Sequence, residues 1–144
     1  MNGVFAACRN FQKLGFQIII ITNQSGIAKG FYDENDFDIV NNWVLAEFKK
    51  NRVNILDVFF CPHAPDDNCN CRKPKPGMLL QAQAKHNIAM NKSWMIGDKE
   101  ADIQAANAAG ITNTILVRSG HKINEANSNA THIIDSLKDY SDIF

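Results

Sequence analysis

Short apolar runs alternate along this chain with segments whose apolar residues recur at helical spacing. The runs cover residues 16–22, 53–60, 93–96, 114–117 and 130–134. They are apolar on both faces, which is typical of strands in a parallel sheet that helices cover on both sides. The alternation therefore predicts an α/β fold with a parallel sheet flanked by helices.

Four helices are predicted between these strands. Apolar spacing gives their lengths, and residues that start or stop helices give their ends. They are a helix over residues 4–14 stopped by Gly15, a helix capped by Asp33, a helix from Pro76-Gly77 to about Asn87, and a helix over residues 100–109 closed by Gly110. The helix after Asp33 is predicted to bury a stripe of Phe37, Val40, Val44 and Phe48.

A cluster of metal-binding side chains follows the second apolar run. Three of the four cysteines and one histidine fall within residues 61–71, as Cys61-Pro-His63 and Cys69-Asn-Cys71. A polar, turn-forming segment joins the two pairs, so the thiols are expected on a loop. The spacing predicts a closed Cys₃His site for structural zinc, with no protein position open for a reacting water.

These cysteines have two other interpretations. Cysteines are often only small buried hydrophobes, and a disulfide within the cluster would leave one thiol over and give His63 no role. Cys8 differs from the cluster because it lies at helical spacing with Val4 and Phe11. Cys8 is therefore predicted to fill the core.

Two loops carry groups suited to a phosphate ligand. Thr22-Asn23-Gln24-Ser25-Gly26 ends the first strand with a hydroxyl, an amide and a glycine, although the same residues are ordinary loop formers. Arg72-Lys73 follows the cysteine cluster and precedes two prolines, which restrict the backbone around both cations. Such rigidity favours a phosphate site over a solvated basic loop.

A third loop, residues 97–102, ends the strand at 93–96. Asp98 at the end of that strand suits Mg²⁺, which takes few protein carboxylates and completes its shell with water and substrate phosphate. Asp102, one turn into the following helix, is predicted to lie next to Asp98 without binding the metal directly. Both carboxylates also favour the start of the following helix.

Composition limits the remaining possibilities. The chain has 144 residues, 45% of them apolar, and equal numbers of acidic and basic residues. One domain over residues 1–144 is expected, without the overall positive charge that nonspecific binding to nucleic acid or anionic membrane requires. The longest purely apolar run, residues 18–21, is too short to span a bilayer, and no signal peptide is recognisable. These features predict a cytoplasmic protein.

The ordered motifs resemble those of the haloacid dehalogenase superfamily. They are Thr22-Asn-Gln-Ser-Gly-Ile, the Cys-x-His and Cys-x-Cys pairs that lead into Arg72-Lys73-Pro-x-Pro-Gly-Met, Gly97-Asp98-Lys99-x-x-Asp102, Leu116-Val-Arg-x-Gly and the closing Ala130-Thr-x-Ile-Ile-Asp-Ser-Leu. Within the superfamily the chain is most similar to zinc-bearing D-glycero-D-manno-heptose 1,7-bisphosphate phosphatases and the related histidinol-phosphate phosphatases. The resemblance implies a three-layer, Rossmann-like fold.

The resemblance also implies roles for individual residues. Thr22 would bind the transferring phosphoryl group and Lys73 would neutralise its charge, while Asn23, Gln24 and Ser25 would line the same pocket. Arg72 would bind the substrate through a second phosphate, and Lys99 would contact a substrate oxygen. Asp98 would hold the catalytic Mg²⁺. Zinc on Cys61, His63, Cys69 and Cys71 would hold the Arg72-Lys73 loop.

One feature of the superfamily is missing. Its members begin with an apolar strand ending in Asp-x-Asp, which supplies the nucleophile and the acid/base, and this strand lies at the centre of the sheet. Asp36-Phe-Asp38 fits the pattern but is expected inside a helix, and Asp66-Asp67 belongs to the cysteine loop. The chain as given is therefore expected to be N-terminally truncated and inactive.

The gap has a structural consequence. Without the central strand, its two neighbours, which end at Thr22 and at Gly97, would have unpaired backbone groups. They are expected to pair with each other directly, or with a segment of another copy of the chain.

Two classes of function remain open. The first is a Mg²⁺-dependent sugar-phosphate phosphatase, with heptose bisphosphate for lipopolysaccharide synthesis as the preferred substrate and histidinol phosphate as the alternative. The second is a noncatalytic, zinc-stapled phosphate-binding module. A nucleic-acid zinc finger is disfavoured by the neutral charge and the absence of Cys-x-x-Cys pairs. His86, His121 and His132 are expected at the surface or in loops.

Overall fold

The chain folds into two compact units. A computed structural model describes residues 3–118 and 123–144, which form a first unit over residues 3–69 and a second over residues 70–144. Each unit has its own parallel sheet, β1-β2 in the first and β3-β4-β5 in the second. The expectation of one domain over residues 1–144 stays a prediction. None of the helices in the described ranges is long and apolar enough to cross a membrane.

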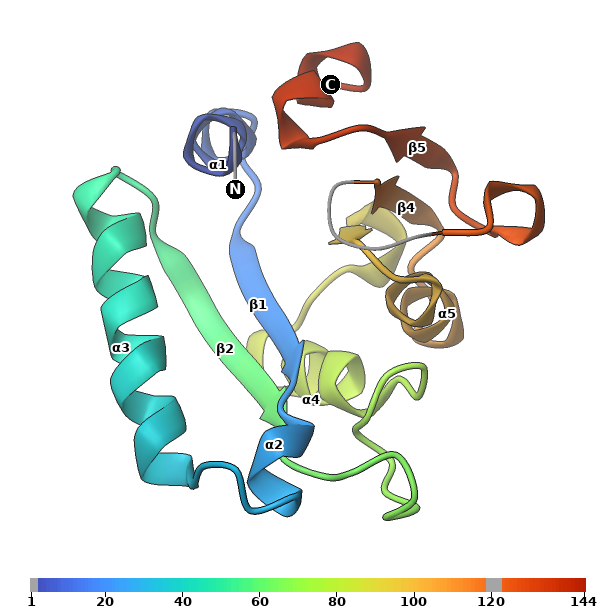
Figure 1. The fold of residues 1–144 in the computed structure, drawn as a ribbon. Coiled ribbons are helices and arrows are strands. Elements are labelled where there is room, and N and C mark those ends of the chain that lie inside the picture. The colour runs from blue at the N-terminus through green and yellow to red at the C-terminus, as the bar shows by residue number, and fades with distance from the viewer. Residues whose placement is uncertain (1–2, 119–122) are drawn as a thin grey trace. The chain divides into compact units, whose positions relative to one another are not determined.

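The first unit contains two parallel strands and three helices (Figure 1). In chain order these are α1 (Val4–Lys13), β1 (Ile18–Asn23), α2 (Ser25–Ala28), α3 (Glu34–Lys50) and β2 (Ile55–Cys61). The predicted stop of the first helix is confirmed, because Gly15 adopts a positive φ of 93° directly after it. The predicted extended segments are also confirmed, with their ends shifted by one or two residues.

The core of the first unit lies where α1 and α3 meet the sheet. Cys8, Phe48 and Val53 are buried there, and burial raises the pKa of the Cys8 thiol, as expected for a core cysteine. Two expectations were wrong. Val40 of α3 is 59% exposed, so the inner stripe is narrower than its spacing suggested, and every residue of β1 is half-buried instead of buried.

A capping box begins α3. The Asp33 carboxylate accepts a hydrogen bond from the Asp36 backbone N–H at 2.9 Å, and the Asp36 carboxylate accepts one from the Asp33 N–H at 3.0 Å. This arrangement satisfies two of the donors that a helix start leaves unpaired, and it confirms the predicted cap.

Replacing Asp33 with alanine is expected to lower the free energy of unfolding by about 1 kcal/mol, because the N-terminal donors of α3 lose their acceptor. Urea denaturation followed by circular dichroism measures the change. Asp38→Ala, which removes an exposed carboxylate one turn into the same helix, is the matched control and should change stability by less than about 0.5 kcal/mol. Equal losses in the two variants would contradict the capping role.

The second unit contains three parallel strands and two helices, which are α4 (Gly77–His86), β3 (Trp94–Gly97), α5 (Glu100–Ala108), β4 (Asn113–Val117) and β5 (His132–Ile134). Single turns of 3₁₀ helix cover Met90–Lys92 and Glu125–Asn127, and a longer one covers Leu137–Asp142. Ile115 and Val117 of β4 and Ile134 of β5 are buried together, and α5 packs against β3 and β4. The predicted helix stop at Gly110 is confirmed by its φ of 91°.

The helix predicted over residues 4–14 is confirmed as α1, which precedes β1. The expected direct pairing of the strands that end at Thr22 and Gly97 stays a prediction, because these two strands belong to different units. Within the described residues β1 pairs with β2 alone, while β3 pairs with β4 alone. Exposed backbone groups on edge strands favour added strands, so self-association stays a prediction.

Candidate functional site

The loop after β1 lies beside the end of β2. In the parallel register Thr22 is opposite Phe60 and Asn23 is opposite Cys61. Beyond the strands the Gln24 N–H donates to the Cys61 carbonyl at 2.7 Å, and the Ala28 N–H donates to the Pro62 carbonyl at 3.1 Å. The first cysteine of the cluster is thus fixed against the candidate phosphate loop by backbone hydrogen bonds.

The candidate phosphate loop is shorter than the sequence suggested. Ser25 and Gly26 already belong to α2, and the four predicted residues from Thr22 to Ser25 are all half-buried. The Gln24 amide donates from Nε2 to the Thr22 hydroxyl oxygen at 2.9 Å. The Gln24 and Thr22 side chains are therefore hydrogen-bonded to each other, which restricts their rotation.

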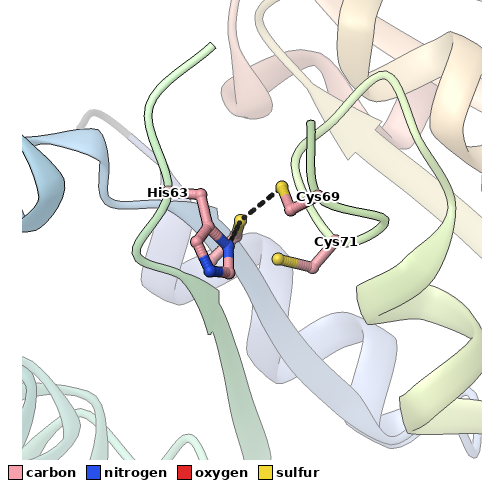
Figure 2. Close-up of side chains that lie close together, drawn as sticks. His63, Cys69 and Cys71 are labelled. Carbon is pink, nitrogen blue, oxygen red and sulfur yellow. Dashed lines mark hydrogen bonds between the residues drawn. The ribbon is translucent and has the colours of Figure 1, made fainter. Parts of the chain in front are cut away.

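The structure brings the four predicted zinc ligands together. One ligand atom from each of Cys61, His63, Cys69 and Cys71 can be chosen so that all lie within 4.8 Å of one another. Figure 2 shows His63, Cys69 and Cys71 of this group. Cys61 Sγ lies 3.4 Å from His63 Nδ1 and 3.6 Å from Cys69 Sγ. Ligands about 2.0–2.3 Å from a tetrahedral zinc are separated by roughly 3.5–3.8 Å. The donor set and these two separations fit structural zinc.

The same cluster contains a disulfide. Cys61 and Cys71 are disulfide-bonded in the structure, a pairing that the sequence pattern disfavoured, while Cys69 lies outside the bond. Reducing that bond yields two thiols next to Cys69 and His63, which restores the full Cys₃His set. A disulfide and a bound metal would therefore compete for the same thiols.

The loop that carries Arg72 and Lys73 is closed on itself. The Gly77 N–H donates to the Asn70 carbonyl at 3.0 Å, and the Lys75 N–H donates to the Arg72 carbonyl at 2.8 Å. A Cβ at Gly77 would overlap the Asn70 carbonyl oxygen, so this close approach requires glycine. Arg72 has a buried Nη1 with no hydrogen-bond partner among the described residues. A buried guanidinium donor of this kind favours an anionic ligand.

Lys73 forms a buried ion pair with Asp102. The Nζ and Oδ1 atoms are 2.6 Å apart, and the two side chains are only 12% and 7% exposed. The other carboxylate oxygen of Asp102 accepts hydrogen bonds from the backbone N–H groups of Asp98 and Lys99, each at 3.2 Å. Asp102 thus connects the predicted phosphate-binding lysine to the turn that carries the predicted magnesium ligand.

The turn after β3 is packed tightly around Asp102. A Cβ at Gly97 would overlap the Asp102 side chain, so glycine is needed there for lack of space. Glu100, in the same turn, accepts hydrogen bonds from the Ser128 hydroxyl at 2.7 Å and the Asn129 N–H at 2.9 Å. Glu100 therefore fastens the segment before β5, a role that the sequence did not indicate.

The histidines outside the cluster do not change this picture. His86 is half-buried and His132 is exposed, and His121 lies outside the described residues.

At the end of β4 the Arg118 guanidinium binds Glu125 at 2.6 Å and Asp135 at 2.9 Å, and these hydrogen bonds raise the pKa of Arg118. Arg118 is thereby occupied by protein carboxylates.

Comparison with known proteins places this arrangement in a family. A HAD-hydrolase-like family model matches residues 70–140. The D-glycero-alpha-D-manno-heptose-1,7-bisphosphate 7-phosphatase of Photorhabdus laumondii is 43% identical over 129 residues, which cover 85% of this chain and 70% of that protein. The D-glycero-beta-D-manno-heptose-1,7-bisphosphate 7-phosphatase of Yersinia pestis is 42% identical over 147 residues, which cover 96% of this chain and 78% of that protein. The chain belongs to the heptose bisphosphate phosphatase family of the haloacid dehalogenase superfamily.

A solved structure agrees with this membership. The D,D-heptose 1,7-bisphosphate phosphatase from B. bronchiseptica, complexed with magnesium and phosphate, matches with a TM-score of 0.83 at 25% identity and covers 99% of this chain and 81% of that chain. The sequence-based assignment to the superfamily and to this family is confirmed. The predicted α/β fold class with parallel sheets is confirmed as well.

Proposed function

We propose that this chain serves the hydrolysis of the 7-phosphate of a D-glycero-D-manno-heptose 1,7-bisphosphate. The observation that carries the proposal is the 42% identity over 96% of the chain to a phosphatase of that name. The relatives include phosphatases named for the alpha and for the beta sugar, so both anomers belong in an assay. The buried Lys73–Asp102 pair supports the proposal, because a phosphoryl-binding cation has to be held in place before substrate arrives.

Individual residues take the roles that the resemblance implied. In the proposed site the Thr22 hydroxyl donates to a phosphoryl oxygen, and Lys73 offsets its negative charge. Arg72 offers a buried guanidinium donor without a protein partner, which suits a phosphate oxygen. Asn23, Gln24 and Ser25 shape the phosphate loop, and Lys99 contacts the substrate.

Magnesium is proposed to bind at Asp98. Superfamily phosphatases use Mg²⁺, and the B. bronchiseptica relative is complexed with it. Asp98 directly follows β3, at the carboxyl end of a parallel strand, where open α/β sheets place their ligands. When bound, Mg²⁺ would supply positive charge to phosphate oxygens.

Zinc is proposed to occupy the Cys61, His63, Cys69 and Cys71 cluster when its thiols are reduced. The separations of about 3.5 Å between its ligand atoms support this, as does the position of Cys71 directly before Arg72. Metal analysis of protein purified under reducing conditions should find one zinc per chain. Protein that, after treatment with reductant, lacks zinc and still has its Cys61–Cys71 disulfide intact would contradict the zinc site.

The chain as given is expected to bind phosphate but to hydrolyse nothing. No Asp-x-Asp follows an apolar strand anywhere in the 144 residues, and Asp36 and Asp38 lie inside α3. With Mg²⁺, phosphate release from either heptose bisphosphate or from histidinol phosphate should stay at the buffer rate, since no carboxylate is placed to attack phosphorus. Colorimetric phosphate detection measures release, and calorimetric titration with inorganic phosphate measures binding.

A fusion protein that supplies the missing strand is the positive control for that experiment. An apolar strand ending in Asp-x-Asp, joined ahead of α1, should allow phosphate release, and the same strand ending in Asn-x-Asn should not. The sugar that supports the faster release identifies the substrate class. Rapid release by the unfused chain would contradict the absence of a nucleophile, and no phosphate binding by it would overturn the proposed function.

A further inference from the structure

Three side chains of the first unit form a hydrogen-bonded series that ends at the candidate phosphate ligand. The Tyr32 hydroxyl donates to Gln24 Oε1 at 2.5 Å, and Gln24 Nε2 donates to Thr22 Oγ1 at 2.9 Å. All three side chains are half-buried. Tyr32 comes from the segment between α2 and α3 and therefore reaches back to the end of β1.

This series decides where the Thr22 proton points. Because Gln24 donates to the Thr22 oxygen, that oxygen acts as an acceptor toward Gln24, and its own proton has to be directed elsewhere. The protein acceptor for that proton is the Asn23 carbonyl, 3.4 Å away, which is long for a hydroxyl donor. The proton is consequently available to an incoming oxygen with better geometry.

The Gln24 side-chain amide could take either of two orientations, which differ by exchange of its oxygen and nitrogen. With the amide reversed, its oxygen would face Thr22 and would accept the Thr22 proton itself, leaving no donor for a ligand. The Tyr32 hydroxyl, as a donor to Oε1, stabilises the orientation that frees the Thr22 proton. Successive bonds of this kind also polarise and strengthen one another.

Gly26 is what lets Tyr32 reach this position. A Cβ at Gly26 would overlap Cε1 of the Tyr32 ring, so any larger residue would displace the ring. The glycine of the Thr22-to-Gly26 motif thus has a steric role in this chain, in addition to any role as a loop former.

We propose that Tyr32 is a positioning residue that acts through Gln24 to aim the Thr22 hydroxyl at a phosphoryl oxygen. The proposal rests on the proposed function, in which Thr22 is a phosphoryl ligand. It adds a residue that no part of the Thr22-to-Gly26 motif contains, and it gives Gln24 an orienting role in place of direct ligand contact.

The test is calorimetric titration of the 144-residue chain with inorganic phosphate. Tyr32→Phe should raise the dissociation constant about fivefold, which corresponds to about 1 kcal/mol, the value of one hydrogen bond. Tyr140→Phe removes the only other tyrosine hydroxyl and is the matched control, with binding expected to stay as in the wild type. Gly26→Ala should weaken binding to a similar degree by displacing the Tyr32 ring.

A double variant separates positioning from a merely structural effect. In a Thr22→Val background no hydroxyl is left to aim, so Tyr32→Phe should cause no further loss of phosphate binding. Unchanged binding in Tyr32→Phe, or an equal loss in the Thr22→Val background, would overturn the proposal.

The hydrogen-bonded series of Tyr32, Gln24 and Thr22 can also be tested in the absence of phosphate. In the ligand-free chain the two Gln24 side-chain amide protons should give separate NMR signals with slow solvent exchange, which Tyr32→Phe should accelerate while Tyr140→Phe does not. If the wild type fails to bind phosphate, the proposed function fails, and this measurement alone decides whether Tyr32 orients Gln24. Identical exchange in wild type and Tyr32→Phe would then overturn the inference.

Discussion

Replacing Asp102 with alanine is expected to lower the free energy of unfolding by about 3–5 kcal/mol, one of the largest losses that a single substitution should cause in this chain. Asp102 forms an ion pair with Lys73, whose side chain is only 12% exposed, so the variant leaves an ammonium group that has little contact with water and has lost the Asp102 carboxylate. It also removes the acceptor of the Asp98 and Lys99 N–H groups at the start of α5. Urea denaturation measures the loss.

Lys73→Met and the double variant show how that loss is divided. In Lys73→Met the Asp102 carboxylate keeps two backbone donors, so this variant should lose less than Asp102→Ala. Adding Lys73→Met to Asp102→Ala should restore part of the stability, because it removes a poorly hydrated ammonium group that has lost its Asp102 partner. Asp142→Ala, at an exposed carboxylate of the same unit, should change stability by less than about 0.5 kcal/mol.

A loss below about 1 kcal/mol in Asp102→Ala would contradict the buried pair, because it would mean that water reaches Lys73 freely. The pair also has a consequence for ligand binding. Without Asp102, Lys73 loses the 2.6 Å ion pair that positions its ammonium group, so phosphate affinity should fall even though the lysine is still present.

The elements of the fold were predictable because they depend on local sequence. Gly15 and Gly110 stop helices by adopting positive φ, and Asp33 begins one by accepting a backbone bond, so each signal lies within a few residues of its effect. The grouping of Cys61, His63, Cys69 and Cys71 was predictable for the same reason, since one segment of eleven residues contains them all.

Side-chain partners far apart in the sequence were not predictable. The spacing of Asp98 and Asp102 suggested a metal ligand and a residue behind it, but nothing in the sequence connected Asp102 to Lys73, 29 residues earlier. Tyr32 was missed because a tyrosine eight residues after Gln24 is unremarkable until the chain folds back. Burial of Val40 was predicted from helical spacing alone, which marks a face but does not say how wide the contact is.

Replacing Cys69 with serine is the second substitution expected to have a large effect. Cys69 lies outside the Cys61–Cys71 disulfide, so a cluster held by that bond would tolerate serine, whereas a Cys₃His zinc site would lose one of its four ligands. We expect Cys69→Ser to weaken zinc binding at least hundredfold. By linkage this removes about 2.7 kcal/mol of stability at saturating zinc, because the metal binds the folded state.

The measurements are zinc content by mass spectrometry and urea denaturation, each under reducing conditions with and without added zinc. Cys8→Ala is the matched control, because it removes a thiol from the core of the first unit and should keep one zinc per chain despite a loss of stability from the cavity. Without zinc, wild type and Cys69→Ser should be equally stable.

The effect should reach the cations that follow the cluster. Cys71 directly precedes Arg72, so a zinc ion bound to Cys71 would restrain the backbone of the Arg72-Lys73 loop. Without zinc, the hydrogen bond from the Gly77 N–H to the Asn70 carbonyl would remain, but the restraint at Cys71 would be lost. Hydrogen exchange at residues 70–77 should therefore rise in Cys69→Ser and stay unchanged in Cys8→Ala. Stability and exchange that are the same in wild type and Cys69→Ser at saturating zinc would contradict a zinc site that uses Cys69.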